Sequence, residues 1–331
     1  MMNNWQKGVS VIICCYNSAA RIRNTLQALA GQRFQRPLAW EIVLVDNAST
    51  DNTAALAEAI WQEIGGPTPF QIVHETAPGQ MNARNKGVET ALYSVVLFCD
   101  DDNRLCPGYV EGVFDILGSN ADLAACGGMG IPAFDTAKPT WFDEYQEAFA
   151  VGSQAINEEG GRILNLYGAG LAVRQPALAH LRRSGFISTM RGRTGGALSS
   201  SDDTELTYAL VLLGYRLHFA KELTFFHYLP RQRLTFDYVK KLFIAFGKDG
   251  PVRNLYYSYL STRRSHQPIR NWYIHMALCM FRLMKYMLLP PKKQGRWIYL
   301  HWNMAYMRQM LILWNKWPAL RENIERINIS R

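Results

Sequence analysis

The first 127 residues alternate continuous apolar runs with stretches that carry apolar residues at helical spacing. Val95–Phe98 is apolar throughout and Val9–Cys14 is apolar except for Ser10, as expected of strands buried on both faces of a sheet. Between them Ile22, Leu26 and Leu29 recur at i, i+4 and i+7, which predicts a helix. Strands separated by roughly 10–15-residue helices form βαβ units and a mostly parallel sheet. The four predicted strands are Val9–Cys14, Glu41–Val45, Gln71–His74 and Val95–Phe98.

Composition and cysteine spacing describe a folded protein of a reducing compartment. With 331 residues, 48% of them hydrophobic and 19% charged, the chain is long enough for one large or two ordinary domains. No CxxC pair occurs among the six cysteines, so neither a zinc site nor disulfide bonds are expected. No N-terminal signal peptide is visible, and we therefore expect a cytoplasmic protein.

The charge is divided unevenly along the chain. Residues 221–331 hold 20 Lys and Arg and 5 Asp and Glu, a charge of +15, so residues 1–220 carry −6 of the total +9. Two segments of the basic part, Asn271–Leu289 and Trp297–Trp317, are rich in aromatic residues, Met and Leu but contain charges. Because a central charge disfavours membrane insertion by ~2.5–3.5 kcal/mol, we expect amphipathic helices on an anionic membrane surface. The alternative is helices that pack on the body or in a dimer; nucleic acid is not expected as the partner.

Three consecutive carboxylates, Asp100, Asp101 and Asp102, directly follow the fourth predicted strand. The carboxyl end of such a strand lies at the edge where open α/β sheets bind ligands. Adjacent carboxylates repel one another, and Asp100 and Asp102 could hold a hard divalent metal that also binds a phosphate. The alternative is a solvated acidic turn. Because the chain has neither a GxGxxG nor a GxxxxGKS/T motif, phosphates would need another means of binding, and a metal supplies it.

Four segments, each at or near the end of a predicted strand, together resemble the family 2 glycosyltransferases of the GT-A fold. These segments are Val9–Asn17, Glu41–Thr53, Pro78–Gly87 and Phe98–Asn103. A weaker resemblance continues through Ser201–Leu206 and Phe226–Tyr228. The resemblance implies an α/β fold of GT-A type, with a Rossmann-like, mostly parallel central sheet flanked by helices. A C-terminal helical extension would follow it.

The resemblance also implies which residues bind the donor and the metal. Asp46 would accept a hydrogen bond from the nucleobase imide, which favours uracil, and Arg84 would face the nucleotide. A divalent ion on the diphosphate would neutralise the charge that grows on the leaving group. The donor-binding residues would be Cys15, Tyr16, Asn17, Asp46, Arg84, Asp100 and Asp101, and the ligands of Mn²⁺ or Mg²⁺ would be Asp100, Asp102 and His227.

Asp203 resembles the catalytic aspartate of the family. A general base must take the proton of the acceptor hydroxyl as it attacks the anomeric carbon opposite the leaving group. Asp202 is the rival for this role. The alternative for both is that they cap the helix that begins here, since Ser and Asp are favoured N-cap residues.

The expected protein is an inverting, metal-dependent glycosyltransferase that moves a sugar from a UDP-sugar to a hydroxyl of a saccharide acceptor. The resemblance implies a lipid-linked acceptor and a role in the assembly of bacterial surface polysaccharides. The alternatives are a catalytically inactive nucleotide-sugar-binding protein and a nucleotidyltransferase on a related α/β fold. The enzyme would be peripheral on the cytoplasmic face of the inner membrane. The expected units are a GT-A domain over 1–247, with a nucleotide-binding half at 1–127 and an acceptor and catalytic half at 128–247, and a basic aromatic tail at 248–331 for membrane or oligomer contact.

Overall fold

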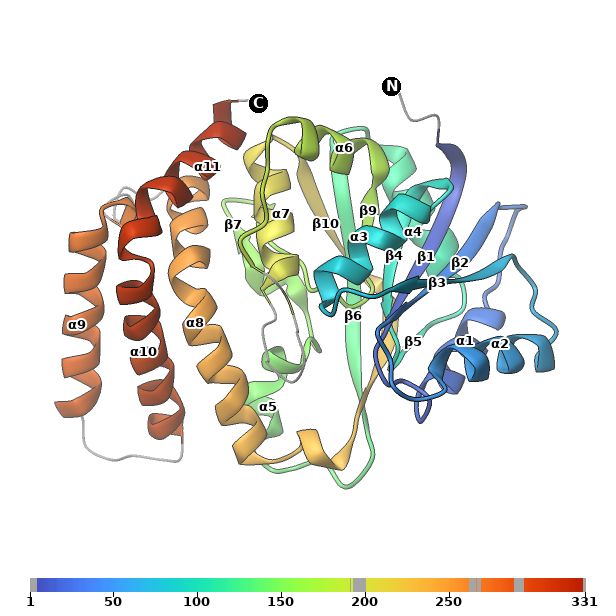
Figure 1. Cartoon of the computed structure of the whole chain (residues 1–331), viewed down its shortest axis with the longest axis horizontal. Helices are drawn as coiled ribbons and strands as arrows, with labels where there is room; N and C mark the ends of the chain where they lie inside the picture. Colours follow the sequence, from blue (N-terminus) through green and yellow to red (C-terminus); the bar gives the residue numbers. More distant parts are fainter. Residues whose placement is uncertain are drawn as a thin grey trace.

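A mostly parallel central sheet organises the protein. The computed structural model describes residues 5–190, 192, 201–261, 266, 269–288 and 295–329. Eight strands form one sheet in the order β3-β2-β1-β4-β9-β6-β10-β5 (Figure 1). The strands are β1 (Gln6–Cys15), β2 (Trp40–Asn47), β3 (Phe70–Glu75), β4 (Tyr93–Asp100), β5 (Asn103–Leu105), β6 (Leu123–Phe134), β9 (Ala172–Arg174) and β10 (Arg216–Leu229), and β7 (Glu158–Glu159) pairs separately with β8 (Arg162–Ile163).

The strand directions bring the ends of the motif-bearing strands together. β1 pairs in parallel with β2 and β4, β2 with β3, and β6 with β10. β9 and β5 are antiparallel to their neighbours. The four strands predicted from the apolar runs lie within β1 to β4, so the carboxyl ends of β1, β2 and β4 meet at one edge of the sheet. This arrangement confirms the predicted mostly parallel α/β sheet.

Helices cover both faces of the sheet because alternate strand residues point to opposite faces. Val11 and Leu44 belong to a hydrophobic cluster with α1, α2 and α4, whereas Ile12 and Val43 belong to a cluster with α3, α6 and α7. The helices are α1 (Ile22–Ala30), α2 (Thr53–Glu63), α3 (Gln80–Thr90), α4 (Tyr109–Ser119), α5 (Phe142–Tyr145), α6 (Gln175–Arg183), α7 (Asp202–Leu212), α8 (Phe236–Leu260), α9 (Trp272–Leu288), α10 (Gly295–Ile312) and α11 (Trp317–Ile329).

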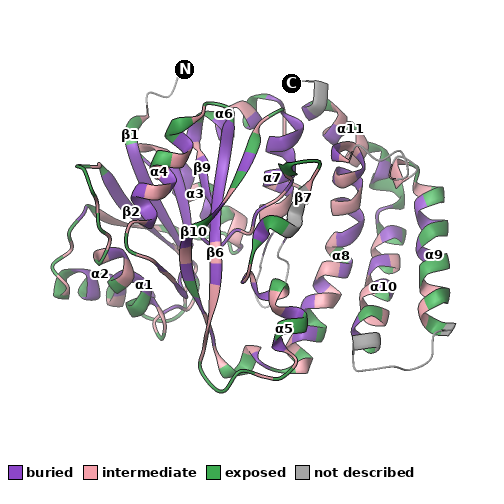
Figure 2. Cartoon of the chain, turned by 180° about the vertical axis from the view of Figure 1, so that it is seen from behind, coloured by how far each residue is buried: buried purple, intermediate pink, exposed green. Residues whose placement is uncertain are grey.

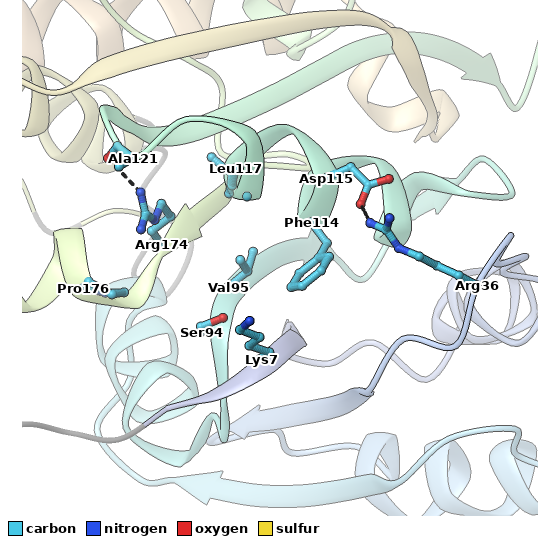
Figure 3. Close-up of a pocket in the computed structure, with 11 residues that line it drawn as sticks. Lys7, Arg36, Ser94, Val95, Phe114, Asp115, Leu117, Ala121, Arg174 and Pro176 are labelled. Atoms are coloured by element: carbon cyan, nitrogen blue, oxygen red, sulfur yellow. Dashed lines mark hydrogen bonds and ion pairs between the residues drawn. The ribbon is translucent and has the colours of Figure 1, made fainter.

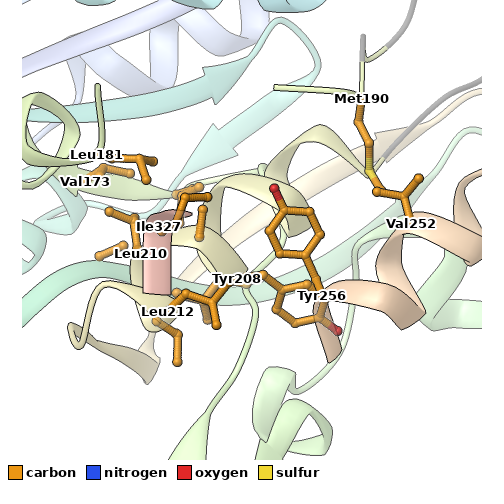
Figure 4. Close-up of a cluster of buried hydrophobic side chains, with 14 of the residues drawn as sticks. Val173, Leu181, Met190, Tyr208, Leu210, Leu212, Val252, Tyr256 and Ile327 are labelled. Atoms are coloured by element: carbon orange, nitrogen blue, oxygen red, sulfur yellow. The ribbon is translucent and has the colours of Figure 1, made fainter. Parts of the chain in front are cut away.

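The C-terminal helices share the hydrophobic core of the body. Figure 4 shows Val252 and Tyr256 of α8 in one buried cluster with Tyr208 of α7. Ile327 of α11 belongs to the same cluster. The predicted domain boundary at residue 247 falls inside α8, which packs on the body beyond it, and the division of the chain at that residue stays a prediction.

α9 is the most exposed of these helices. α8, α10 and α9 lie side by side, with α10 in the middle (Figure 1). Figure 2 shows much of α9 in the colour of exposed residues, and its Tyr273 and Phe281 side chains are each 66% exposed. Within the described ranges, no helix is both long and apolar enough to cross a bilayer.

Candidate active site

A large cavity opens at the carboxyl ends of β1, β2 and β4. Its volume is about 970 Å³. Cys15 at the end of β1, Asn47 at the end of β2 and Asp100 at the end of β4 all line it. Open α/β sheets bind ligands at this edge, and the loops after the strands are free to carry polar side chains. The cavity is therefore the candidate active site.

The predicted donor-binding residues divide into those that line the cavity and those beside it. Asn17 and Asp46 lie at the same sheet edge but outside the lining. The Asn17 side-chain oxygen accepts a hydrogen bond from the Thr50 N–H at 2.8 Å, and Asp46 Oδ2 lies 3.2 Å from His74 Nδ1. Asn17 therefore joins two loops to each other. The predicted residues that line the cavity are Cys15, Tyr16, Arg84, Asp100 and Asp101.

Asp101 and Asp102 are both buried but have different partners. Arg21 Nη2 donates to Asp101 Oδ2 at 2.6 Å, and the Ser18 hydroxyl donates to the same oxygen. Burial raises the pKa of Asp101, and the hydrogen bond from Arg21 opposes the rise. Arg233 follows β10 in the sequence, and its Nη1 donates to Asp102 Oδ2 at 2.9 Å. Asp101 thus anchors the segment before α1, whereas Asp102 joins the β4 end to the β10 side of the cavity.

A backbone carbonyl orients the ring of His227, near the end of β10. His227 Nδ1–H donates to the Phe149 carbonyl at 2.8 Å, because a carbonyl oxygen only accepts. The other ring nitrogen, Nε2, then points toward Asp102, and the distance from Nε2 to Asp102 Oδ1 is 3.5 Å. Proteins commonly hold a metal-binding histidine in this way, with one ring nitrogen on a carbonyl and the other toward the ion.

The predicted metal ligands Asp100, Asp102 and His227 all line the cavity. Among the residues that the structure describes, no three His, Cys, Asp or Glu side chains form a ready-made metal centre. Mg²⁺ in particular is often held by one or two carboxylates together with substrate phosphates and water. The residues present therefore fit an ion that is bound together with a diphosphate.

Arg84 and Asp202 form a buried ion pair in the lining of the cavity. Arg84 Nη1 donates to Asp202 Oδ2 at 2.7 Å, and the two side chains are 7% and 3% exposed. Burial disfavours the charge on Arg84, but Asp202 and Asp203 outweigh burial and raise its pKa. Arg84 was predicted to face the nucleotide; the structure places it in the cavity lining and on Asp202.

Asp203, next to Asp202 on the first turn of α7, also lines the cavity. Asp203 Oδ2 accepts a hydrogen bond from the Gly168 N–H at 2.5 Å, and Oδ1 accepts one from the Thr204 N–H at 2.7 Å. Burial raises the pKa of Asp203 from 3.8 to about 7; the charge of Asp202 adds to the rise and that of Arg84 opposes it. A carboxylate with a pKa near neutrality is well suited to accept a proton.

Sequence reasoning missed the residues on the other side of the cavity. They come from α5, the short helix Gln146–Phe149, α8 and α10. For Tyr299 and Trp302 the signal in the sequence was the abundance of aromatic residues after position 268, for which we expected a membrane surface, with packing on the body as the alternative. The side chains that form this wall include Tyr145, Glu147, Phe243, Arg253, Tyr299 and Trp302.

A second cavity of about 640 Å³ lies at the opposite edge of the sheet, where β1 and β4 begin (Figure 3). Lys7, Arg36 and Arg174 line it together with apolar side chains. Arg36 pairs with Asp115, and Arg174 Nη1 donates to the Ala121 carbonyl at 2.7 Å. No predicted site residue lies in this lining, so it adds nothing to the candidate chemistry.

Comparison with known proteins identifies a family. The model described as Glycosyl transferase family 2 matches residues 10–182. The uncharacterized glycosyltransferase YibD of Escherichia coli (strain K12) is 31% identical over 127 residues, which are 38% of this chain and 35% of that protein. The matched segments span only about a third, 33% to 37%, of the first curated relatives.

Solved structures share the fold over nearly the whole chain. S. aureus TarS 1-349 matches with a TM-score of 0.51 and 16% identity, over 98% of this chain and 90% of that chain. The mannosyltransferase PcManGT from Pyrobaculum calidifontis, in complex with GDP-Man and Mn²⁺, matches with a TM-score of 0.52 and 16% identity, over 98% and 75%. At such identities the likeness shows the fold alone. It confirms the predicted GT-A type with a C-terminal helical region.

Proposed function

Because the chain belongs to glycosyl transferase family 2, we propose that it moves a sugar from a UDP-sugar to a hydroxyl group of a saccharide acceptor, with inversion at the anomeric carbon. The observation that carries this proposal is that Asp203 shares one cavity with Asp100 and Asp102. Group transfer from a nucleoside diphosphate needs charge stabilisation at the leaving oxygen and a proton acceptor at the attacking oxygen. The two sets of carboxylates would serve these two needs.

In the proposed reaction the acceptor oxygen attacks the anomeric carbon from the face opposite the diphosphate. A carbon–oxygen bond to the acceptor forms while the bond to the diphosphate oxygen breaks, and its electron pair leaves with UDP. Asp203 takes the proton of the acceptor hydroxyl. The ion pair of Asp202 with Arg84 supports this choice of base, because Asp202 already has a cationic partner at 2.7 Å.

Asp100 and Asp102 would hold a Mn²⁺ or Mg²⁺ ion on the diphosphate, with His227 Nε2 on the same side as Asp102. Such an ion, when bound, would neutralise the charge that develops on the departing diphosphate. Arg233, which donates to Asp102, would keep that carboxylate oriented.

Two observations support uridine as the nucleoside. Asp46 lies at the sheet edge beside the cavity lining, and its Oδ1 accepts no hydrogen bond from the described residues, so this oxygen would be the acceptor for the N–H of the uracil imide. TarS has been solved in complex with UDP and with UDP-GlcNAc. PcManGT was solved with GDP-Man, so the fold itself accepts either nucleoside and a direct test is needed.

Calorimetric titration of UDP, with GDP as the comparator, tests the proposal with and without Mn²⁺. We expect metal-dependent binding that favours UDP and weakens in Asp102→Ala. GDP selectivity would overturn the role of Asp46 and keep the transferase chemistry. If neither nucleotide binds, the cavity is not a nucleotide site and the proposal is wrong.

The variant Asp203→Asn separates transfer from binding. We expect it to abolish sugar transfer while UDP affinity stays within a few-fold of the parent, because Asp203 acts on the acceptor. Retained transfer would move the base to another residue. An unaltered protein that binds UDP but turns over no UDP-sugar would favour a binding protein without catalysis.

We also propose that α9 and the outer side of α10 rest on an anionic membrane surface, the cytoplasmic leaflet in the setting expected above. Residues 250–320 contain eleven Lys and Arg and no Asp or Glu. Phe281 and Met284 of α9 are 66% and 54% exposed, and Arg282 lies beside them. Exposed apolar side chains with basic neighbours and no acidic ones suit the interface of an anionic bilayer.

Vesicle flotation tests the membrane contact. We expect the full chain to bind vesicles that contain phosphatidylglycerol and not vesicles of phosphatidylcholine alone. Phe281→Glu combined with Met284→Glu should abolish this binding. Leu92→Glu, at an exposed position distant from α9, should leave it unchanged. Equal binding by both variants would contradict the proposed surface.

A further inference from the structure

The wall of the cavity opposite the carboxylates is built by the C-terminal helices. Phe243 lies on α8, and Tyr299 and Trp302 lie on α10; all three line the same cavity as Asp100 and Asp203. At about 970 Å³ the cavity is near the upper end of the range, roughly 300–1,000 Å³, of small-molecule sites. This volume leaves room for a second substrate beside a nucleotide-sugar.

Aromatic rings from three distant segments form a continuous surface on this wall. The ring of Phe243 meets that of Tyr145 from α5 and that of Tyr299 from α10, each at 5.7 Å between centroids and 86° between planes. Edge-to-face contacts of this kind stabilise aromatic pairs beyond the area that they bury. Tyr299 is nevertheless 41% exposed, so part of its ring is available to a ligand in the cavity.

Two glycines of α8 determine how close α10 comes to the cavity. A Cβ added at Gly247 would lie 2.4 Å from the backbone oxygen of Trp302, and one added at Gly250 would lie 2.5 Å from the ring of Tyr306. Glycine lowers helix stability, so its presence at both positions points to the close approach as the reason. The contact places Trp302 of α10 against α8 and at the cavity.

A buried hydrogen-bond network fixes the three helices relative to one another. The Tyr306 hydroxyl of α10 accepts from Asn254 Nδ2 of α8 at 2.7 Å and lies 2.6 Å from His275 Nε2 of α9. Burial lowers the pKa of His275 to about 4, so the imidazole is neutral at neutral pH. The aromatic wall is therefore held by specific contacts.

Carboxylates stand beside the rings. Glu144 and Glu147 line the cavity, and the Tyr145 hydroxyl donates to Glu144 Oε1 at 3.1 Å. A sugar presents C–H groups on the faces of its ring and hydroxyl groups at its edge, which match aromatic faces and carboxylate oxygens. A purely apolar ligand would leave the carboxylates desolvated and without hydrogen bonds, at a cost in free energy.

We propose that α8 and α10 form the acceptor subsite, in which a sugar unit stacks on Tyr299 and Trp302 and donates hydroxyl hydrogen bonds to Glu144 and Glu147. The inference rests on the proposed transferase function and adds to it that the C-terminal helices are part of the active site. Tyr299 and Trp302 would then determine which acceptors the enzyme accepts, without a role in donor binding.

Ligand-observed NMR with the full chain, saturated with UDP and Mg²⁺, tests this assignment. The probes are the disaccharides cellobiose, lactose, mannobiose and chitobiose. We expect at least one of them to bind, and its affinity to fall about tenfold or more in Tyr299→Ala and in Trp302→Ala. Tyr299→Phe and Trp302→Phe should largely retain binding, because they keep an aromatic ring.

Trp297→Ala is the matched control, since Trp297 lies on the same helix but is 63% exposed and outside the cavity lining. It should leave both disaccharide and UDP affinity unchanged. A disaccharide that binds equally well to Tyr299→Ala and Trp302→Ala would overturn the assignment. Binding of UDP with none of the four disaccharides would overturn a saccharide as the ligand. If the unaltered protein did not bind UDP, the proposed function itself would be refuted instead.

Discussion

Replacement of Arg84 by methionine would remove the cation that is paired with the buried carboxylate of Asp202 and lies near Asp203. The Arg84 and Asp202 side chains are 7% and 3% exposed, and Asp203 is the next residue of α7. Loss of one partner of a buried ion pair costs about 3–5 kcal/mol, because the remaining charge stays buried without compensation. We therefore expect Arg84→Met to lower the free energy of unfolding by about that amount at neutral pH.

The loss should depend on pH in a defined direction. The pKa of Asp203 is raised from 3.8 to about 7, so the folded state binds the Asp203 proton more tightly than the unfolded state. The protonated Asp203 therefore adds to the free energy of unfolding at acid pH, and this contribution is lost as pH rises from about 3.8 to about 7. Arg84 lowers the pKa of Asp203, so removing Arg84 extends this window to higher pH. The deficit of Arg84→Met should be larger at about pH 8 than at about pH 5.5.

Urea unfolding followed by far-ultraviolet circular dichroism measures both quantities. Arg23→Met is the matched control, since it removes an exposed ion pair with Glu63 and should leave stability nearly unchanged. Adding Asp202→Asn to Arg84→Met should restore part of the loss, because it removes the uncompensated charge. A loss below about 1 kcal/mol, or an equal loss at the two pH values, would refute this account of the cluster.

Three further predictions concern the base, its neighbour and the C-terminal helices. The rate of sugar transfer should rise as pH increases through about 7, where Asp203 loses its proton, and a rate independent of pH would exclude it as the base. Gly168→Ala should impair transfer, measured as kcat, because its Cβ would lie 2.4 Å from Arg84 Nη2 and 3.0 Å from Asp203 Oδ2; parental kcat would argue against this contact. Gly247→Ala should lower both the melting temperature and disaccharide affinity, whereas Gly118→Ala, with open space around it, should lower neither.

The sheet and the carboxylate edge could be predicted because their signals are local. The apolar run Val9–Cys14 lies within β1, and Asp100 to Asp102 follow β4 as a direct continuation of the chain. Strand direction then places Cys15 and Asp100 in one cavity without further information. The roles of the individual site residues are still predictions that the experiments above would test.

The acceptor wall could not be predicted in this way. The ring of Phe243 contacts those of Tyr145 and Tyr299. In the sequence, however, Tyr145 precedes Phe243 by about a hundred residues and Tyr299 follows it by more than fifty, so no local pattern relates the three. The aromatic and basic composition of the tail favoured a membrane surface over the alternative of packing on the body, although Ile327 of α11 is fully buried. Gly247 and Gly250 were the available signal, because two glycines one turn apart in a helix indicate a close helix contact.

α10 serves both proposals through different sides. Tyr299 and Trp302 line the cavity, whereas Met304 and Leu311 are 55% and 60% exposed and do not line it. If both proposals hold, a lipid-linked acceptor would meet the membrane surface and the acceptor subsite on one helix. Tyr299→Ala should then weaken disaccharide binding and leave vesicle binding intact, while Leu311→Glu should do the reverse. Variants that change both properties together would show that α10 acts only by holding the body in place.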